Sequence, residues 1–501
     1  MSVIIPAAYS LNHLQRQIAV SQRLEPLEII LVVSSRLIPQ LPPAAASHCQ
    51  VIPVDGPASL FAGRALGAAQ ARGDILLFLG EDRYYPNAGL QRFLFPLRYG
   101  QVDVMLSREA ARGRVAQCPK PVHSLSLLFN ELYGRMDLLE ASLIDTPHAM
   151  TRAALRRLGA ERLAHPADAH RELVKSGVSL RAMPLAPDRD IMPFQPQLAG
   201  TWLSELSVWE QAVIAEHAAV CARLPWRGGL GDGGRRRDLA DRSVSKENEL
   251  LQATGEERLQ WKTGLCGGQG LSVIIPACNE AATIGAVIRE VRQLAPAEII
   301  VVVNGSHDKT AQIARQHAVA TVELPQALGV DTGRAVGASL AGGEWLLFVD
   351  ADFVIPAMEL YPFVRACRLG ADLALNDQSR FLAGNTANAV TAARQALNVA
   401  ANRKELRYGS MLAVPFALRR ESFAPLGWSL LACPPKAQAA AALAGLDIRQ
   451  VHEVDSFARN RLRPEKNLAP LGRTPAVEQL LGDHIEALQL LAERGGIKRE
   501  R

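Results

Sequence analysis

Short apolar runs alternate with segments of helical spacing along the C-terminal half of the chain. The runs of strand length lie at 272–277, 298–303, 320–324 and 345–349. Between the first two, apolar residues recur at the spacing of one helix face, from Ile284 to Leu294. Strands that alternate with helices predict parallel βαβ units with right-handed crossovers, that is, an α/β fold with a mostly parallel sheet.

The N-terminal half repeats this pattern in the same register. Ser2–Ala7 is identical to Ser272–Ala277, an offset of 272 − 2 = 270. When 1–82 is compared with 271–352 without a gap, 26 of 82 positions are identical, which chance would not maintain in one register. The period is far longer than that of a solenoid repeat. We therefore predict two tandem α/β domains produced by duplication.

The predicted domains are 1–225 and 271–501, joined by a linker at 226–270. Each domain would end in a helical tail, one containing Glu216-His217 and the other Asp483-His484. Residues 227–234 include five glycines, and three arginines follow at 235–237. This composition is typical of a flexible, solvated linker.

Composition and charge exclude several classes of protein. A net charge of +5 over 501 residues, with 5% aromatic residues, does not indicate nucleic-acid binding. Apolar runs are strand-sized, so we expect no transmembrane segment. Seven cysteines without a C-x-x-C pair argue against a disulfide framework or a zinc site. Because the first predicted strand begins at Ser2, we expect no signal peptide. These features predict a cytoplasmic protein, with a peripheral position at the inner face of the membrane left open.

Polar residues follow three of the predicted strands. Asn279, Asn304 and the pair Asp350 and Asp352 each come within a few positions of the end of an apolar run. Ligands of parallel sheets bind outside the carboxyl ends of the strands, so these side chains should share one edge. Two carboxylates at i and i+2 suit a hard divalent cation. The alternative is a loop with two solvated aspartates.

Four segments of the second half, in this order, resemble the motifs of the family-two nucleotide-sugar glycosyltransferases of the GT-A fold. They are Ser272–Glu280 (SVIIPACNE), Asn304–Thr310 (NGSHDKT), Gly333–Gly337 (GRAVG) and Asp350–Asp352 (DAD). Phe416–Glu421 is similar to the acceptor-side strand and helix of that family. The resemblance implies two tandem, Rossmann-like GT-A domains with helical tails, of which the second carries the complete nucleotide-side set.

The resemblance also implies roles for individual residues. The nucleotide-binding set would be Pro276, Asn279, Glu280, Asn304, Arg334 and Asp350. A Mn²⁺ or Mg²⁺ ion would be held by Asp350 and Asp352, with His452 as a third ligand. Such an ion stabilises the charge that develops on a diphosphate leaving group. The alternatives are purely structural roles: Asn279 only caps a helix, Arg334 only pairs with Asp331, and His452 only contributes to the fold.

The implied partners are a nucleoside-diphosphate sugar donor, with UDP as the expected nucleotide, and an unknown acceptor. The acceptor-side segment 378–408 carries arginines and asparagines, which suit a polyhydroxylated or anionic acceptor, but a solvated helix surface would look the same. The two domains would pack as an intramolecular pseudo-dimer.

The sequence departs from the family at two places. Val303 stands where the family usually has an acid, and Cys433–Lys436 lacks the carboxylate that inverting members place before a late helix. A general base needs a carboxylate within hydrogen-bond reach of the acceptor hydroxyl. Our candidates are Asp377 and Asp455, followed by Asp447 and Glu453. A retaining mechanism, which does not need this base, fits the same gap.

The first domain has lost most of the residues that would bind a nucleotide. Asn279-Glu280 is replaced by Tyr9-Ser10, and Asp350-Ala351-Asp352 by Gly80-Glu81-Asp82. We therefore predict a degenerate N-terminal copy. The main alternative to an enzyme is an inactive pseudo-glycosyltransferase that acts as a scaffold or regulatory partner. A nucleotidyltransferase would need a Gly-rich G-x-G-T-R loop, and a processive synthase would need transmembrane helices, which the sequence lacks.

Overall fold

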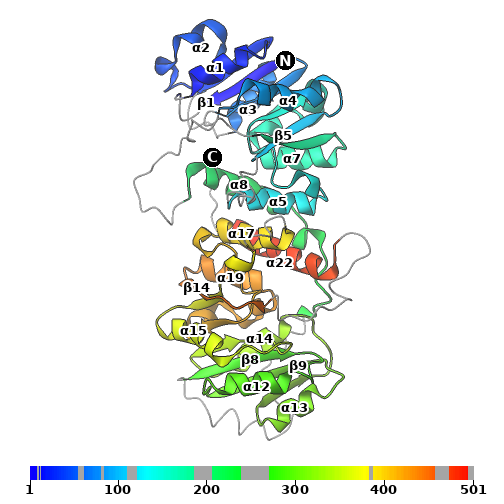
Figure 1. Cartoon of the computed structure of the whole chain (residues 1–501), viewed down its shortest axis with the longest axis vertical. Helices are drawn as coiled ribbons and strands as arrows, with labels where there is room; N and C mark the ends of the chain where they lie inside the picture. The colour runs from blue at the N-terminus through cyan, green and yellow to red at the C-terminus, as the bar shows by residue number, and fades with distance from the viewer. Residues whose placement is uncertain are drawn as a thin grey trace. The chain divides into compact units, whose positions relative to one another are not determined.

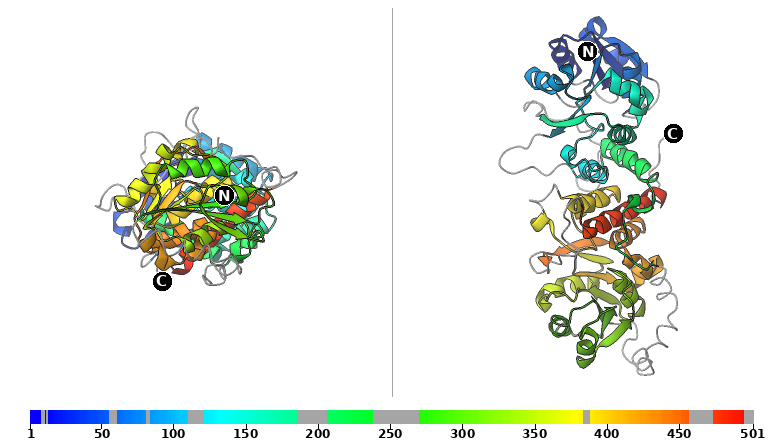
Figure 2. Two further views of the ribbon diagram at one scale, coloured as in Figure 1. Left: turned by 90° about the horizontal axis from the view of Figure 1, so that it is seen from below. Right: turned by 90° about the vertical axis from the view of Figure 1, so that its right-hand side faces the viewer.

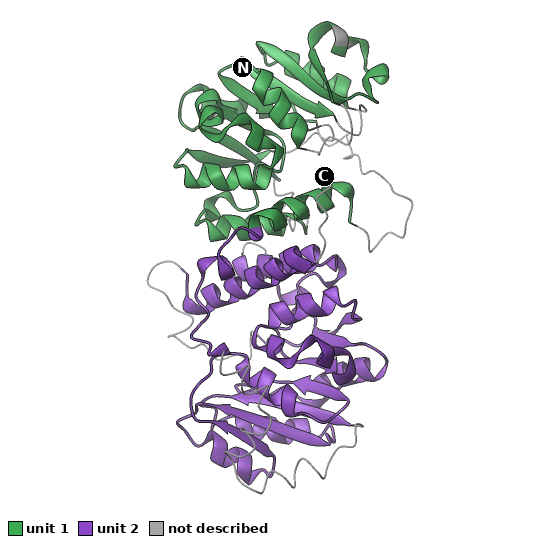
Figure 3. Cartoon of the chain, turned by 180° about the vertical axis from the view of Figure 1, so that it is seen from behind, with its two compact units in different colours: residues 1–220, 498–501 green, residues 221–497 purple. Residues whose placement is uncertain are grey.

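The structure is a computed structural model that divides into two compact units, residues 1–220 and residues 221–497 (Figure 3). It describes the whole chain except residues 8–10, 12, 55–60, 81–83, 110–120, 186–205, 238–269, 383–387, 457–472 and 495–501. Tyr9, Ser10, Glu81, Asp82 and most of the expected linker therefore lie outside the described residues.

The second unit is built on a seven-stranded sheet. Its strands are β8 (Leu271–Ala277), β9 (Glu298–Asn304), β10 (Ala320–Leu324), β11 (Trp345–Phe348), β12 (Leu373–Asn376), β13 (Phe416–Arg419) and β14 (Ile448–His452). Their order is β10-β9-β8-β11-β13-β12-β14, and only β13 runs antiparallel to its neighbours. This confirms the predicted α/β class with a mostly parallel sheet.

The described helices of this unit pack on the sheet or on one another, and α22 lies against α17 and α19 (Figures 1 and 2). The helices are α12 (Ile284–Arg292), α13 (Thr310–Gln316), α14 (Thr332–Leu340), α15 (Ala357–Arg368), α16 (Ser379–Leu382), α17 (Ala389–Ala400), α18 (Arg420–Phe423), α19 (Pro434–Leu443) and α22 (Pro475–Arg494). The predicted amphipathic face on α12 is buried through Ile284, Val287, Ile288 and Val291. Burying these apolar side chains against the sheet is the main force that holds such a helix in place.

The first unit contains a second seven-stranded sheet with the same arrangement. Its strands are β1 (Ser2–Ala7), β2 (Glu28–Ser34), β3 (Gln50–Val54), β4 (Ile75–Phe78), β5 (Val104–Glu109), β6 (His148–Thr151) and β7 (Leu180–Leu185). The order is β3-β2-β1-β4-β6-β5-β7, with β6 antiparallel. The shared order is what a duplication would produce, but the origin by duplication stays a prediction.

Alternate residues of β1 serve the two faces of the first sheet. Val3 and Ile5 belong to the apolar cluster that includes Leu14 and Ile18, whereas Ile4 belongs to the opposite cluster with Ala68. This alternation is the two-residue period of a strand that is buried on both sides. The helices of this unit are α1 (Leu14–Gln22), α2 (Pro43–His48), α3 (Ala62–Gln70), α4 (Asn87–Arg98), α5 (His123–Leu132), α6 (Arg152–Leu158), α7 (Pro166–Lys175) and α8 (Val208–Cys221).

The prediction of a solvated linker at 226–270 is wrong for its first part. Residues 221–237 belong to the second compact unit, and the side chains of Arg227 and Arg235 are fully buried there. Carboxylates on α22 and in the segment itself pair with these guanidinium groups. Charge composition alone could not reveal partners that lie about 250 residues away.

None of the helices in the described parts of the chain is both long and apolar enough to cross a bilayer.

Candidate functional site

Three parallel strands bring the predicted polar residues to one edge of the second sheet. Ile274 of β8 pairs with Ile300 of β9 on one side and with Phe348 of β11 on the other. Asn304 ends β9, and Asn279 and Asp350 follow the neighbouring strands β8 and β11, so all three stand at the carboxyl edge, where ligands of such sheets bind. This edge is the candidate donor site.

Asn279 fastens the loop after β8 to the loop after β9. Its backbone N–H donates to the Ser306 hydroxyl at 3.0 Å, and its side-chain Oδ1 accepts from the backbone N–H of His307 at 2.9 Å. It adopts φ 58, a left-handed conformation that asparagine tolerates better than most residues. Asn279 is not a helix cap, because the N-cap of α12 is Thr283. Its nucleotide-binding role stays a prediction.

Asp308 ties the same two loops together from the other side. Its carboxylate accepts from the backbone N–H groups of Ala281 and Thr310, each at 3.0 Å. Burial alone would raise the pKa of Asp308, but hydrogen bonds from Thr310 and from these backbone groups hold it below its usual value. The pair of loops is thus fixed by protein contacts.

Asn304 is engaged with the segment that precedes α14. Its Nδ2 donates to the carbonyl of Gly329 at 2.8 Å, and its Oδ1 accepts from the backbone N–H of Leu328 at 2.7 Å. The side chain is buried. Asn304 therefore holds the approach to α14 in this structure, and its expected contact with base or ribose stays a prediction.

The loop after β8 also reaches the loop that carries the two aspartates. The hydroxyl of Thr283 donates to the carbonyl of Ala351 at 2.6 Å, between Asp350 and Asp352. Thr283 lies 3.4 Å from the carboxylate of the buried Glu280. Pro276, half-buried in β8, lies directly beneath α14, because a Cβ added to Gly333 would sit 3.0 Å from its side chain.

Arg334 forms ion pairs with two aspartates. Its Nη1 lies 2.7 Å from Asp331, and its Nη2 donates to Oδ1 of Asp350 at 3.0 Å. Burial would lower the pKa of Arg334, but Asp350 and Asp331 raise it above its usual value. The alternative that Arg334 pairs with Asp331 alone is wrong, since it also contacts the first aspartate of the D-x-D pair.

Asp350 and Asp352 suit a hard cation through their ligand chemistry, but the structure does not assemble the predicted trio. Within the described residues, no three His, Cys, Asp or Glu side chains are grouped so that they could hold one ion. His452 ends β14, which is three strand positions from β11, about 14 Å at the usual strand spacing. The two aspartates therefore stay the predicted ligands, and His452 lies away from them.

The candidate bases lie on the acceptor half of the sheet. Asp377 follows β12 and accepts from the backbone N–H of Ser379 at 3.0 Å and from Gln450 at 3.2 Å. Asp455 follows β14 at the same edge. Glu453 lies 3.9 Å from Arg380. Asp447 precedes β14 and pairs with Arg449, which places it at the opposite edge. The assignment of Asp377 and Asp455 stays a prediction.

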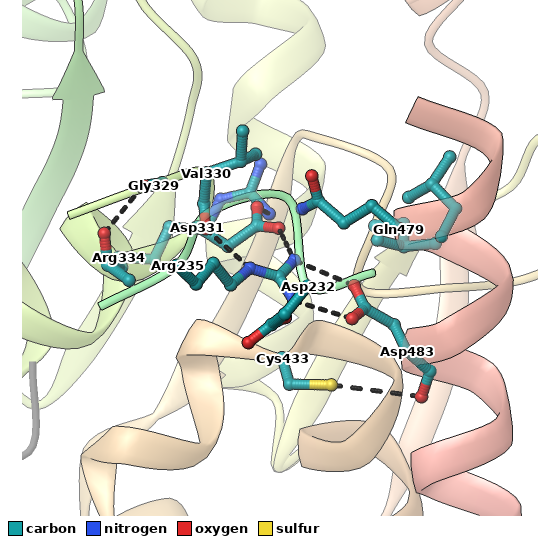
Figure 4. Close-up of polar contacts among 12 residues, drawn as sticks. Asp232, Arg235, Gly329, Val330, Asp331, Arg334, Cys433, Gln479 and Asp483 are labelled. Atoms are coloured by element: carbon teal, nitrogen blue, oxygen red, sulfur yellow. Dashed lines mark hydrogen bonds and ion pairs between the residues drawn. The ribbon is translucent and has the colours of Figure 1, made fainter. Parts of the chain in front are cut away.

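Sequence reasoning missed Arg235, the residue that pairs with Asp331 behind Arg334. Asp331, in the left-handed conformation before α14, also pairs with the buried Arg235 at 3.0 Å (Figure 4). The available signal was the proximity of Asp331 and Arg334, three positions apart. No local pattern links either residue to position 235.

Comparisons with known proteins give one match to a protein family. The model described as Glycosyl transferase family 2 matches residues 272–412, which run from β8 to the approach of β13. The match covers the donor-site loops and α17 but not β13 or β14. The comparison with curated proteins finds no match.

Several solved structures of glucosyl-3-phosphoglycerate synthase from Mycobacterium tuberculosis are similar in part. A complex with Mn²⁺, UDP and glucosyl-3-phosphoglycerate is 23% identical over 46% of this chain and 81% of that chain, with a TM-score of 0.34. A complex with Mn²⁺ and UDP-glucose is 24% identical over 42% and 76%, with a TM-score of 0.32. A complex with Mg²⁺ and UDP is 21% identical over 48% and 83%, with a TM-score of 0.34.

Proposed function

We propose that this chain is a glycosyltransferase that moves a sugar from a nucleoside-diphosphate sugar, with UDP as the nucleotide, to an acceptor at the carboxyl edge of the second sheet. The observation that carries the proposal is the coincidence of two findings. Residues 272–412 match the glycosyltransferase family model, and the same stretch brings Asn279, Arg334 and Asp350 to the donor edge.

A divalent cation fits this site. Asp350 and Asp352 offer carboxylate oxygens, the ligands that Mn²⁺ and Mg²⁺ accept readily. The side chain of Asp350 is 30% exposed, so it is accessible from solvent while Arg334 holds one of its oxygens. When bound, the ion would act as a Lewis acid on the departing diphosphate. Arg334 would orient Asp350 and add positive charge beside it.

The acceptor would lie toward β12 and β14. Arg394 of α17 is buried there and donates to Gln378 at 2.6 Å, and Gln378 in turn donates to Ser456 at 2.7 Å. Burial lowers the pKa of Arg394 to about 10, and no carboxylate pairs with it in the described parts of the chain. A buried cation without a counter-charge is costly, which supports an anionic acceptor.

The first sheet would serve as a degenerate partner without donor chemistry. Arg64 occupies the position of Arg334, but Phe61 replaces Asp331 and Gly80 replaces Asp350. Its guanidinium donates instead to the carbonyls of Leu143 and Ile144, at 2.6 and 2.9 Å. This unit therefore lacks the acidic pair that the proposed donor site requires.

Isothermal titration of UDP with and without Mn²⁺ tests the donor site. We expect binding that requires the metal in the wild type, and a loss of at least about tenfold in affinity in Asp352→Asn, since even the loss of a group that only supports a metal ligand typically costs about 10–100-fold in metal affinity. Asp308→Asn is not a suitable control because it loosens the loops, whereas Asp447→Asn lies at the opposite edge and should bind UDP like the wild type.

Metal-independent binding, or equal binding by Asp352→Asn, would contradict the proposed site. The alternative of an inactive scaffold makes a different prediction. It allows UDP to bind but predicts no metal-dependent hydrolysis of UDP-sugars, which a coupled assay for released UDP would detect. Slow hydrolysis that Asp352→Asn abolishes would favour the enzyme.

A further inference from the structure

The segment 227–237 is part of the second unit rather than a tether. Arg227 donates to Asp483 at 2.6 Å and to the carbonyl of Gln479 at 2.9 Å. Arg237 donates to Asp232 at 2.7 Å and to Glu486 at 2.8 Å. We call residues 227–237 the arginine strap. Arg227 and Arg237, the first and last residues of the strap, both pair with carboxylates of α22.

Arg235 joins α22 to the turn before α14 (Figure 4). Its two terminal nitrogens donate to the two oxygens of Asp483, at 2.6 and 2.8 Å. The same guanidinium donates to Oδ2 of Asp331 at 3.0 Å and to the carbonyl of Val330 at 3.0 Å. A planar guanidinium with several donors is suited to such a bridge, and a lysine could make only part of it.

The turn before α14 is shaped to receive the strap. Gly329 has φ +95, and a Cβ there would lie 2.8 Å from the Cα of Arg235. Only glycine allows this backbone conformation together with this close approach. The strap backbone is also bonded to the turn, since the N–H of Arg236 donates to the carbonyl of Leu328 at 2.9 Å.

Acidic and basic side chains alternate along a series of ion pairs that leads from α22 to the donor site. Asp483 pairs with Arg235, Arg235 with Asp331, Asp331 with Arg334, and Arg334 with Asp350. The two oxygens of Asp331 are divided between the two arginines, Oδ2 for Arg235 and Oδ1 for Arg334. If Arg235 were removed, both oxygens would be available to Arg334, which could then turn away from Asp350.

The first unit indicates that the fold itself does not need this series of ion pairs. Arg64, at the position of Arg334, is buried and donates to two backbone carbonyls, and positions 61 and 80 carry Phe and Gly in place of Asp331 and Asp350. Buried ion pairs cost desolvation and are a poor means of gaining stability. The acidic residues of the second unit therefore call for a role other than folding.

We propose that Arg235 is a positioning residue for the donor site, and that the arginine strap fixes the orientation of Arg334 and Asp350 through Asp331. This inference rests on the proposed function for its purpose, but the coupling itself can be measured without a nucleotide. The strap thereby makes the segment between the two sheets a component of the second unit's site.

The test compares Arg235→Gln with Arg237→Gln. Arg237 lies in the same strap and donates to Asp232 and Glu486. It lies 4.0 Å from Asp483 but forms no ion pair with Asp331, so its loss loosens the strap while the pairs from Asp483 through Arg235 to Asp331 remain. Hydrogen exchange of the peptide that carries residues 349–354 is measured without ligand. We expect faster exchange there in Arg235→Gln and no change in Arg237→Gln. Equal exchange in the two variants would overturn the proposal.

Titration of UDP with Mn²⁺ supplies the second readout. Coupling between contacting residues commonly amounts to a factor of about ten in affinity, so we expect UDP to bind about tenfold more weakly to Arg235→Gln than to Arg237→Gln. If the wild type does not bind UDP, the proposed function fails, and hydrogen exchange still decides whether Arg235 positions Asp350. If the wild type binds and the variants match each other, the positioning role fails alone.

Arg235→Lys covers the case in which Arg235→Gln does not fold. Lysine keeps a cation beside Asp483 but lacks the planar fork that reaches Asp331 at the same time. We expect this variant to unfold cooperatively at a temperature below that of the wild type but above that of Arg235→Gln, together with an intermediate loss of UDP affinity. A normal UDP affinity in Arg235→Lys would show that charge alone, rather than the bridge to Asp331, is what the site needs.

Discussion

At the scale of single residues, side chains that hydrogen-bond one loop to another fix the positions of the loops that form the donor site. Asn279 is exposed and left-handed, and yet its backbone N–H and its side-chain oxygen are both bonded to the loop after β9. Binding is stronger when a protein does not have to order its loops on association. The exposed Cys278 precedes Asn279 directly, which makes it a reporter for this edge.

UDP together with Mn²⁺ should slow the alkylation of Cys278. A nucleotide that fills the donor edge would cover this thiol, whereas Cys221, Cys367 and Cys433 are buried and should react slowly in any case. Burial also raises the pKa of Cys221 and of Cys367 to about 12, which lowers their thiolate fraction. Reaction with N-ethylmaleimide, followed by peptide mass spectrometry, measures the rate at Cys278 alone.

The protection should require the metal and the second aspartate. UDP without Mn²⁺, and UDP with Mn²⁺ added to Asp352→Asn, should leave the rate at Cys278 close to that of the free protein. If UDP and Mn²⁺ do not protect Cys278 in the wild type at concentrations that saturate binding, the nucleotide does not lie beside the loop after β8.

At the scale of elements, α14 connects the sheet to the site. Gly337 faces β8 so closely that a Cβ would lie 2.5 Å from Cγ2 of Ile274, and Gly67 stands in the same relation to Ile4 in the first unit. The glycines of the G-R-x-x-G motif therefore serve helix–sheet packing in both units. The arginine between them has different partners in the two units, because Arg334 pairs with Asp331 and Asp350 whereas Arg64 donates to two backbone carbonyls.

Gly337→Ala should destabilise the second unit by about 1–3 kcal/mol, the usual cost of adding a methyl group to a packed core. Gly67→Ala should cost the first unit a similar amount, since the contact distance is the same. Because α14 carries Arg334, we expect only Gly337→Ala to weaken UDP binding as well. Chemical denaturation and UDP titration of both variants measure the two effects. Equal UDP affinities would argue that small shifts of α14 do not reach Asp350.

The elements themselves could largely be predicted from the sequence. Strands such as β9 are buried on both faces and therefore appear as continuous apolar runs, and α12 shows its buried stripe. The arginine strap could not be predicted, because Arg235 meets Asp331 across 96 positions and Asp483 across 248. Sequence patterns report local periodicity, whereas a buried charge is explained only by its partners in space.

At the scale of the whole molecule, the two units share a strand order but differ in their buried polar groups. Asn130 binds Nε2 of His170 at 2.7 Å, and at the matching place Asn398 binds Gln438 at 2.7 Å. His148 stacks on Phe78 with ring centroids 4.6 Å apart, where the second unit stacks Phe416 on Phe348 at 4.6 Å. The first unit thus has titratable histidines where the second unit has a glutamine and a phenylalanine.

Mild acid should therefore loosen the first unit before the second. Burial lowers the pKa of His148 and of His170 to about 3 and that of His217 to about 4, while His484, also at about 4, is the one such histidine found in the described part of the second unit. An unfolded histidine titrates near 6.5. Between these values protons bind preferentially to the unfolded chain, so stability falls as the pH drops below about 6.5. Between pH 6.5 and 5 the loss is on the order of 2 kcal/mol per histidine.

Hydrogen exchange at pH 7 and pH 5, corrected for intrinsic exchange rates, would resolve the two units in the intact chain. We expect protection in β4, β6 and α7 to fall more than protection in β11, β13 and α19. The double variant His148→Phe/His170→Gln introduces the residues that the second unit uses at these places, so the packing has a precedent within the same molecule. It should retain protection at pH 5. If the variant loses protection at pH 5 as the wild type does, groups other than these two histidines control the acid response of the first unit.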